Sequence, residues 1–145
     1  MSRPATRTAP PPVLGVGVDL VENARMQSTL TRWGKSFRKK VFLPAEQAYC
    51  DGRPEPWRHY AGRFAIKEAV SKAFGTGISE HLGWLDIEVR RDPATGAPSV
   101  QLSVKGGRLA ESRGVGRVLV SLSHTRRYAV AQALLLGRQE GETTR

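Results

Sequence analysis

The residue types most able to do chemistry in this chain occur together in RFAIKEAVSKAFGTG, residues 63–77. This segment predicts one helix that is ended by a Gly-Thr-Gly turn. On such a helix Glu68 and Lys72 are four residues apart and share a face. Ala61 and Ala65 continue the same stripe. A carboxylate and an ammonium beside small side chains could form the floor of a site for a metal ion and phosphate groups. Taken alone, the spacing is more often that of a surface ion pair.

A second acid, Asp19, lies at the end of a predicted strand over residues 13–20. Strand alternation puts Asp19 on one face with Gly15 and Gly17, so that face offers almost no side chains beside the carboxylate. An isolated Asp at a strand end is typical of a cap on the following turn or helix. Together with Glu68, however, it could supply the two carboxylates of a Mg²⁺ site, provided that the strand and the helix meet.

The segment from Ser121 to Thr125, SLSHT, puts hydroxyls and an imidazole at the end of another predicted strand, next to Arg126 and Arg127. A polar hairpin turn explains this composition. An edge that contacts phosphate explains it as well, because hydroxyl, imidazole and guanidinium groups are all suitable donors. The spacing shows no Ser-His-acid triad, which disfavours a hydrolase.

The formal net charge of +10 indicates an anionic partner. Nucleic acid, a membrane surface, an acidic protein and a multiply phosphorylated cofactor all fit this charge. The predicted helix over residues 23–41 carries much of it, and no acid occurs from residue 23 to residue 45. That one-sided charge favours docking of an acidic partner. The basic residues concerned are Arg25, Arg32, Lys35, Arg38, Lys39 and Lys40.

Length and composition predict one domain over residues 13–137, between a disordered Pro-rich tail, 1–12, and a second disordered tail, 138–145. No apolar run is long enough to span a bilayer, so we expect no membrane partner. The single cysteine, Cys50, excludes an intramolecular disulfide and suits a reducing cytoplasm.

The order of predicted elements indicates an α+β fold, with a mostly antiparallel sheet packed against a long central helix. We expect helices over residues 23–41, with a break near Gly34, from about Pro44, over 57–74 and over 106–112. The apolar residues of the first helix recur at three- and four-residue intervals and predict one apolar seam: Met26, Leu30, Trp33, Phe37 and Val41. We expect strands over residues 13–20, 85–90, 100–104, 117–123 and 128–135.

Three separated blocks give the chain a resemblance to the holo-acyl-carrier-protein synthases, the small class of 4′-phosphopantetheinyl transferases. GVGVDLVE, residues 15–22, resembles the opening strand motif of that family. Residues 63–77 resemble its signature helix and turn. SLSHT, residues 121–125, followed by YAVA, resembles its terminal motif. The resemblance runs from about residue 13 to residue 136 and implies the 4′-phosphopantetheinyl transferase-like fold.

The resemblance implies transfer of the phosphopantetheine arm of coenzyme A to a serine of an apo acyl carrier protein, with release of adenosine 3′,5′-bisphosphate. Asp19 and Glu68 would hold Mg²⁺ together with pyrophosphate oxygens and water. Lys72 would neutralise charge on the attacked phosphate or the leaving group. The base that takes the serine proton stays open: a metal-held water, a carboxylate of this chain and one of the carrier are all candidates.

The remaining site residues implied by the resemblance contact coenzyme A. His124, with Ser123 and Thr125, would lie along its phosphates. Arg63 and Lys67 belong to the signature helix and are assigned to the same ligand, with less defined roles.

The resemblance also implies partners. Arg25 matches the arginine that meets acidic residues of the carrier protein, and family members of this size form homotrimers with sites between subunits. Two alternatives follow from the charge and the motifs: a basic nucleic-acid-binding module, and a catalytically silent subunit that binds the carrier. We expect the enzyme, with no nucleic-acid partner, in the cytoplasm.

Overall fold

The computed structural model describes residues 9–139. The elements within this range follow one another as β1 (Val13–Glu22), α1 (Asn23–Val41), α2 (Pro44–Asp51), α3 (Pro56–Ala73), η1 (Trp84–Asp86), β2 (Ile87–Arg91), β3 (Pro98–Leu102), α4 (Val104–Ser112), β4 (Val115–His124) and β5 (Tyr128–Gly137). The predicted α+β class with antiparallel strands is confirmed.

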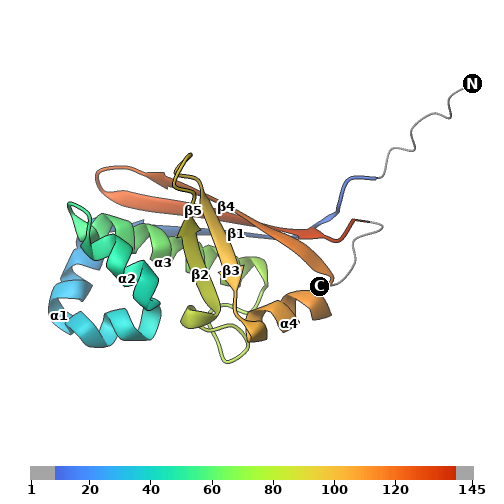
Figure 1. Cartoon of the computed structure of the whole chain (residues 1–145), viewed down its shortest axis with the longest axis horizontal. Helices are drawn as coiled ribbons and strands as arrows, with labels where there is room; N and C mark the ends of the chain where they lie inside the picture. Colours follow the sequence, from blue (N-terminus) through green and yellow to red (C-terminus); the bar gives the residue numbers. More distant parts are fainter. Residues whose placement is uncertain (1–8, 140–145) are drawn as a thin grey trace, which may run out of the picture.

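The larger sheet has three antiparallel strands in the order β1-β5-β4, and β2 and β3 form a separate antiparallel pair. Helix α3 lies along one face of the larger sheet and contacts all three of its strands. Helices α1 and α2 lie at one end of the molecule and α4 lies toward the other (Figure 1). Residues of β1, α1 and α3 that are far apart in sequence are thereby brought together.

The glycines of β1 allow α3 to approach the strand closely. A Cβ atom built on Gly15 would lie 2.2 Å from the carbonyl oxygen of Ala73, and one built on Gly17 would lie 1.9 Å from that of Ala69. No side chain fits at either position. The expectation of an open face beside Asp19 is therefore wrong, because the backbone of α3 covers the glycine face.

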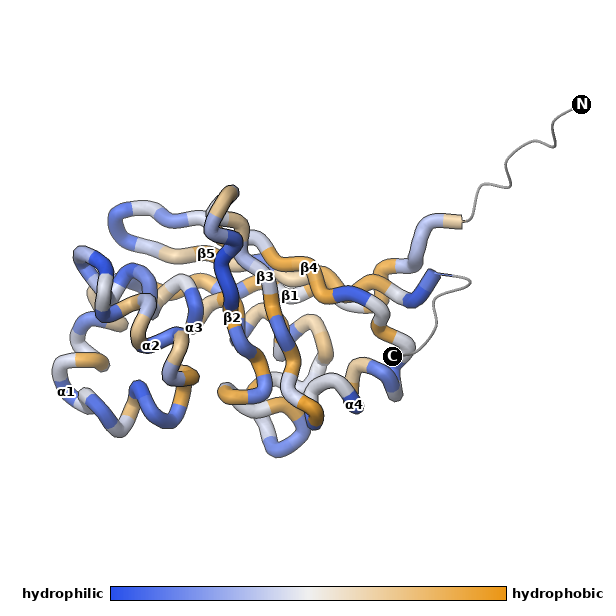
Figure 2. Tube along the Cα trace, viewed as in Figure 1, coloured by the Kyte–Doolittle hydropathy of each residue, from blue (hydrophilic) through white to orange (hydrophobic). Residues whose placement is uncertain are grey.

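The core lies between α3 and the larger sheet. Along β5, Ala129, Ala131, Ala133 and Leu135 are buried on the α3 side. The opposite face carries apolar residues that no element of residues 9–139 covers, and hydrophobic segments recur along this sheet in Figure 2. We call this surface the open sheet face; its exposed apolar residues include Val16, Val18, Leu20, Leu119 and Val130.

The predicted break in the first helix is confirmed, because Gly34 has φ 50° and ψ −125° inside α1. Trp33 beside it is 56% exposed, although its spacing predicted a core position. Trp33 directly precedes the kink, and the residues buried in this half of α1 are Asn23, Met26 and Leu30. The next difference is in β2, which begins at Ile87, since residues 84–86 form the 3₁₀ turn η1.

The predicted tails lie mostly outside the described residues, which exclude 1–8 and 140–145. At the inner edges of the tails, the backbone N–H of Gly137 donates to the carbonyl of Pro12, and that of Arg138 donates to the carbonyl of Gly114. No helix among residues 9–139 combines the length and apolar character needed to cross a membrane.

Candidate functional site

The structure brings together the three residues predicted to be catalytic. Asp19 reaches this position from β1, and Glu68 and Lys72 reach it from α3. The Nζ atom of Lys72 lies 3.0 Å from Oδ1 of Asp19 and also donates to the carbonyl of Val18 at 3.1 Å. The ammonium is thus directed at the acid on the strand, across the interface between two elements. Asp19 does not cap a helix, because α1 begins four residues later, at Asn23.

The charged form of the Glu68 carboxyl group is destabilised by its surroundings. Burial raises its pKa from the usual 4.5, and the negative charge of Asp19 raises it further, against a smaller opposing effect of Lys72. Two carboxylates that repel each other favour a cation between them. No cluster of three or more His, Cys, Asp or Glu occurs in residues 9–139, so this pair offers two protein ligands. That number suits Mg²⁺, which usually takes one or two carboxylates and fills its shell with waters and substrate phosphates.

The alanines next to Glu68 on the predicted stripe do not form the floor of the site. Ala61 and Ala65 are both fully buried. They belong to the core that anchors α3, so the prediction of an open alanine-lined stripe is wrong. Only the Glu68–Lys72 part of the stripe faces the neighbourhood of Asp19.

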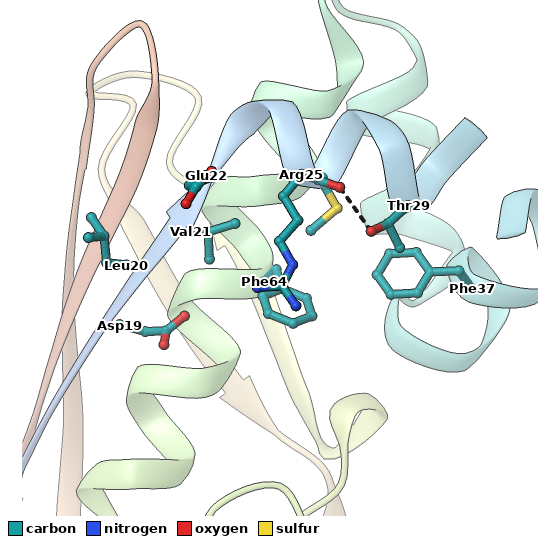
Figure 3. A pocket seen from close by; sticks show the side chains of 9 residues that line it. Asp19, Leu20, Val21, Glu22, Arg25, Thr29, Phe37 and Phe64 are labelled. Carbon is teal, nitrogen blue, oxygen red and sulfur yellow. Dashed lines mark hydrogen bonds between the residues drawn. The ribbon is translucent and has the colours of Figure 1, made fainter. Parts of the chain in front are cut away.

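A cleft of about 380 Å³ opens beside Asp19. Its wall includes Asp19 from β1, Arg25 from α1 and Phe64 from α3, and Figure 3 shows these three side chains around it. The backbone of Arg25 is held in the helix, where its carbonyl accepts a hydrogen bond from the hydroxyl of Thr29 at 2.9 Å. The predicted metal ligand and the predicted partner-binding arginine therefore line one cleft.

Lys67 is not available to a ligand. Its side chain is fully buried, and its Nζ lies 2.8 Å from Oε1 of Glu46. The ammonium also donates to the carbonyls of Trp84 and Ile87, at 2.9 and 2.7 Å. Because these contacts use all three of its protons, Lys67 joins α3 to α2 and β2. Its predicted contact with coenzyme A is corrected to a structural role.

A second cleft, of about 340 Å³, lies on another side of α3 and is strongly basic. Arg63 and His124, both predicted to bind the cofactor, line it together. The imidazole of His124 packs against Gly62, where an added Cβ would come within 2.9 Å of its Cε1. We call this space the cationic cleft; its basic residues are Arg53, His59, Arg63, Arg90, Arg91 and His124.

The histidines of the cationic cleft are held toward their neutral forms. Burial lowers the pKa of His124, and the charges of Arg58 and Arg63 lower it further. Burial also lowers the pKa of His59, with the same sign of contribution from Arg63 and His124. A bound anion would counteract these shifts, because negative charge favours protonated imidazole.

Ser123 and Thr125 do not accompany His124 into the cationic cleft. Ser123 pairs with Val130 and therefore points to the open sheet face, opposite to His124. The hydroxyl of Thr125 accepts a hydrogen bond from the backbone N–H of Tyr128 at 2.9 Å and closes the β4–β5 turn. On this chain the three residues do not form a single phosphate-contacting edge.

Sequence reasoning missed several residues that shape the two clefts. Tyr49, Arg53 and His59 lie outside the signature helix, and only their positions in the fold relate them to Arg63. Asn23 holds the start of α1 against the β4–β5 turn, where its Nδ2 donates to the carbonyls of Thr125 and Arg126 at 3.2 and 3.1 Å. A polar residue directly after the strand was a signal for a cap, but gave no indication of this partner.

The two clefts are separate on one chain. Their linings share no residue: Phe64 lines the first cleft and Arg63 lines the second. Successive residues of α3 thus serve different surfaces. On one chain, the carboxylate of Asp19 and the cationic cleft therefore do not belong to a single pocket that one ligand could fill.

A family model and several known proteins match this chain. A family model described as ACPS, the 4′-phosphopantetheinyl transferase superfamily, matches residues 15–133. The holo-[acyl-carrier-protein] synthase of Syntrophus aciditrophicus is 46% identical over 128 residues, 88% of this chain and 99% of that relative. The crystal structure of the Neisseria meningitidis holo-[acyl-carrier-protein] synthase has a TM-score of 0.80 and 27% identity, and the match covers 86% of this chain and 98% of the other. For the Helicobacter pylori enzyme in complex with coenzyme A, the TM-score is 0.73, the identity 30% and the coverage 83% and 98%. The chain belongs to the 4′-phosphopantetheinyl transferase superfamily, among enzymes of the holo-[acyl-carrier-protein] synthase type.

Proposed function

We propose that this enzyme transfers the 4′-phosphopantetheine group of coenzyme A to a serine of an apo acyl carrier protein in a Mg²⁺-dependent reaction and releases adenosine 3′,5′-bisphosphate. The observation that carries the proposal is the meeting of Asp19, which lines a cleft, with Glu68 and Lys72 of α3. The Helicobacter pylori relative is described in complex with coenzyme A, which supports the donor.

The residues suit a reaction that splits a pyrophosphate. Asp19 and Glu68 would hold Mg²⁺, which when bound would neutralise charge on the pyrophosphate oxygens. The ammonium of Lys72 is half exposed and lies at the same place, so it can stabilise charge that develops on the attacked phosphate or on the leaving group. The nucleophile is the serine of the carrier, which accounts for a site that needs no nucleophile of its own.

The cationic cleft supplies the second anion site of the proposal. Arg63 is only 7% exposed as a residue, and it lines a cleft that His124 also lines. These groups would bind a phosphate of coenzyme A, since guanidinium and imidazole groups both donate to phosphate oxygens. The pKa of His124 would then rise on binding, and the ligand would be held more tightly at lower pH.

The carrier would dock on α1. Arg25 lies in the cleft next to Asp19, so a carrier that pairs with this arginine would bring its serine close to the carboxylates. The basic side of α1 would attract the acidic surface of the carrier and accelerate association.

A homotrimer would complete the site. The two clefts do not join on one chain, and the open sheet face carries the exposed apolar residues that a subunit interface would bury. We propose that Asp19 and Glu68 of one subunit act together with the cationic cleft of its neighbour. The free and buried thiol of Cys50 supports a location in the cytoplasm as part of the proposal, because a reducing compartment suits an unpaired cysteine.

The test combines the purified protein, coenzyme A, Mg²⁺ and a panel of apo carrier proteins, with intact-mass measurement of each carrier. We expect a gain of one phosphopantetheine per carrier with the wild type, and none after chelation of the metal. An unchanged mass across the panel would reject the transferase. If nucleic acid were then bound tightly at physiological salt, the basic-module alternative would replace it.

A further inference from the structure

Tyr49 of α2 lines the cationic cleft and contacts several of its basic residues. The guanidinium carbon of Arg63 lies 4.0 Å from the centroid of its ring, and that of Arg53 lies 4.7 Å from it. The ring of His59 meets Tyr49 edge-on, with a centroid separation of 5.8 Å and an interplanar angle of 83°. One aromatic side chain of α2 thus contacts two basic residues of α3 and a third, Arg53, that precedes this helix.

Arg63 has little else to hold it. It is 7% exposed, and its Nε has no hydrogen-bond partner. The ion pairs formed within residues 9–139 do not include Arg63 or Arg53. A buried guanidinium without a carboxylate requires another source of stabilisation, and the electron-rich face of an aromatic ring provides one. In this cleft the ring of Tyr49 is that source.

An aromatic face differs from a carboxylate in its effect on ligand binding. A carboxylate would neutralise Arg63 and compete with an incoming phosphate. The ring holds the cation in place and leaves its charge available to the ligand, while it also keeps a second cation nearby. The side chains are therefore ordered before the anion arrives, which reduces the entropy lost on binding.

We infer that Tyr49 is a positioning residue of the coenzyme A site, which acts by holding Arg63 and Arg53 in the geometry that receives a phosphate. The inference rests on the proposed function for the identity of the ligand. It assigns to Tyr49 no contact with the reacting atoms.

The experiment compares Tyr49→Leu, which removes the ring, with Tyr49→Phe, which keeps the ring and removes only the hydroxyl. Binding of coenzyme A is measured by calorimetry, and kcat and KM are measured with an apo carrier. We expect Tyr49→Leu to raise the Kd and KM for coenzyme A about tenfold while kcat changes less than twofold, because the ring holds the binding group and not the reacting phosphorus. Tyr49→Phe should restore both constants to within about twofold of wild type.

A mutant cycle identifies the route of the effect. If Tyr49 acts through these two arginines, adding Tyr49→Leu to a variant that carries both Arg53→Gln and Arg63→Gln should weaken binding no further. Additive losses, or equal losses in the Leu and Phe variants, would overturn the inference. Thermal unfolding is followed in parallel, and Tyr49→Met replaces Tyr49→Leu if the latter fails to fold.

The outcomes separate this inference from the proposed function. A wild type that neither binds coenzyme A nor modifies a carrier would overturn both. A wild type that does both, beside a Tyr49→Leu variant with unchanged constants, would overturn the positioning role alone.

Discussion

Helix α3 contributes the lysines of two lysine–carboxylate ion pairs. The N–O distances of the two pairs are nearly identical, but one pair is buried and the other is partly exposed. Lys67 pairs with Glu46 at 2.8 Å, and both side chains are fully buried. Lys72 pairs with Asp19 at 3.0 Å, and these side chains are 49% and 15% exposed. The lysines are five residues apart, so they leave the helix on different sides. Distance alone therefore does not separate a structural ion pair from one that belongs to the proposed reaction site.

The difference lies in how completely each pair is satisfied. Glu46 accepts hydrogen bonds from the backbone N–H groups of Leu43 and Val89, at 2.8 and 2.9 Å, in addition to Lys67. Burial lowers the pKa of Lys67, and the charge of Glu46 opposes that shift. The Lys72–Asp19 pair is not enclosed by the protein in this way. Beside it, the negative charge of Asp19 raises the pKa of Glu68. The enclosed pair holds elements together, whereas the exposed pair retains unused capacity for a ligand.

The largest effect is expected at the buried pair. Lys67→Met leaves the carboxylate of Glu46 buried without its cation, so the free energy of unfolding should fall by about 3–5 kcal/mol. Urea denaturation followed by circular dichroism measures it. Lys72→Met is the matched control on the same helix, and its effect on stability should stay below about 1 kcal/mol. Equal losses in the two variants would remove the distinction between the pairs.

Substitutions at Asp19 and Glu68 should show the opposite pattern, with a large loss of activity and little loss of stability. We expect Asp19→Ala and Glu68→Ala each to lower turnover about 10²–10³-fold, because charge at the transferred phosphate would lose its stabilisation. The midpoint of thermal unfolding should change little. The carrier mass assay gives the rate, and intact activity in both variants would refute the metal assignment.

The next prediction concerns Arg25, whose substitution should affect the two proposed substrates differently. Arg25→Glu places an acid where an acidic carrier would dock, so the KM for the carrier should rise about tenfold. The KM for coenzyme A should change less than about twofold, since Arg25 does not line the cationic cleft. Lys105→Glu on α4 serves as a charge-reversal control on another surface. Equal effects on both substrates would exclude a docking role for Arg25.

The smallest effect concerns pH and Glu68. Its pKa is raised in the folded state, by burial first and by Asp19 second, so the folded protein binds its proton more tightly than the unfolded chain does. The carboxylate therefore lowers stability as pH rises from 4.5 through the raised value, and the loss persists at neutral pH. At pH 7, Glu68→Gln should raise the free energy of unfolding by no more than about 1 kcal/mol, and below pH 4 the gain should vanish. Thermal unfolding of the wild type and of Glu68→Gln, measured across pH without Mg²⁺, tests this prediction. A Glu68→Gln variant that is less stable than the wild type at pH 7 would contradict it.

Much of the fold follows from local patterns. The alternation of β1 and β5 and the apolar stripe of α1 specify elements whose bounds agree with the structure to within a few residues. Leu85 was misassigned to a strand, because alternation continues into the 3₁₀ turn η1. Trp33 was misplaced directly beside Gly34, where the helix breaks. Both errors arise where the backbone departs from regular geometry.

The candidate site was less accessible to sequence reasoning. The meeting of Asp19 with Lys72 depends on β1 and α3 packing together, which no spacing within either element encodes. The burial of Lys67 depends on Glu46, which is 21 positions earlier in the chain and has no recognisable relation to it in sequence. The separation of Ser123 from His124 could have been predicted, since neighbouring residues of a strand face opposite sides.

In the proposed metal site, the two glycines of β1 would influence which ion the enzyme accepts. Asp19 and Glu68 lie on facing elements, so the gap between their carboxylates follows the separation of β1 and α3, which Gly15 and Gly17 set at backbone contact. Even one methyl group at Gly17 would push the helix outward and widen that gap. Mg²⁺ requires oxygen ligands at about 2.0–2.1 Å, and Ca²⁺ takes them at about 2.3–2.6 Å. In the proposed site, the lack of side chains at Gly15 and Gly17 would therefore keep the two carboxylates close enough to favour Mg²⁺ over the larger Ca²⁺. The two glycines would select the ion by size although neither of them contacts it.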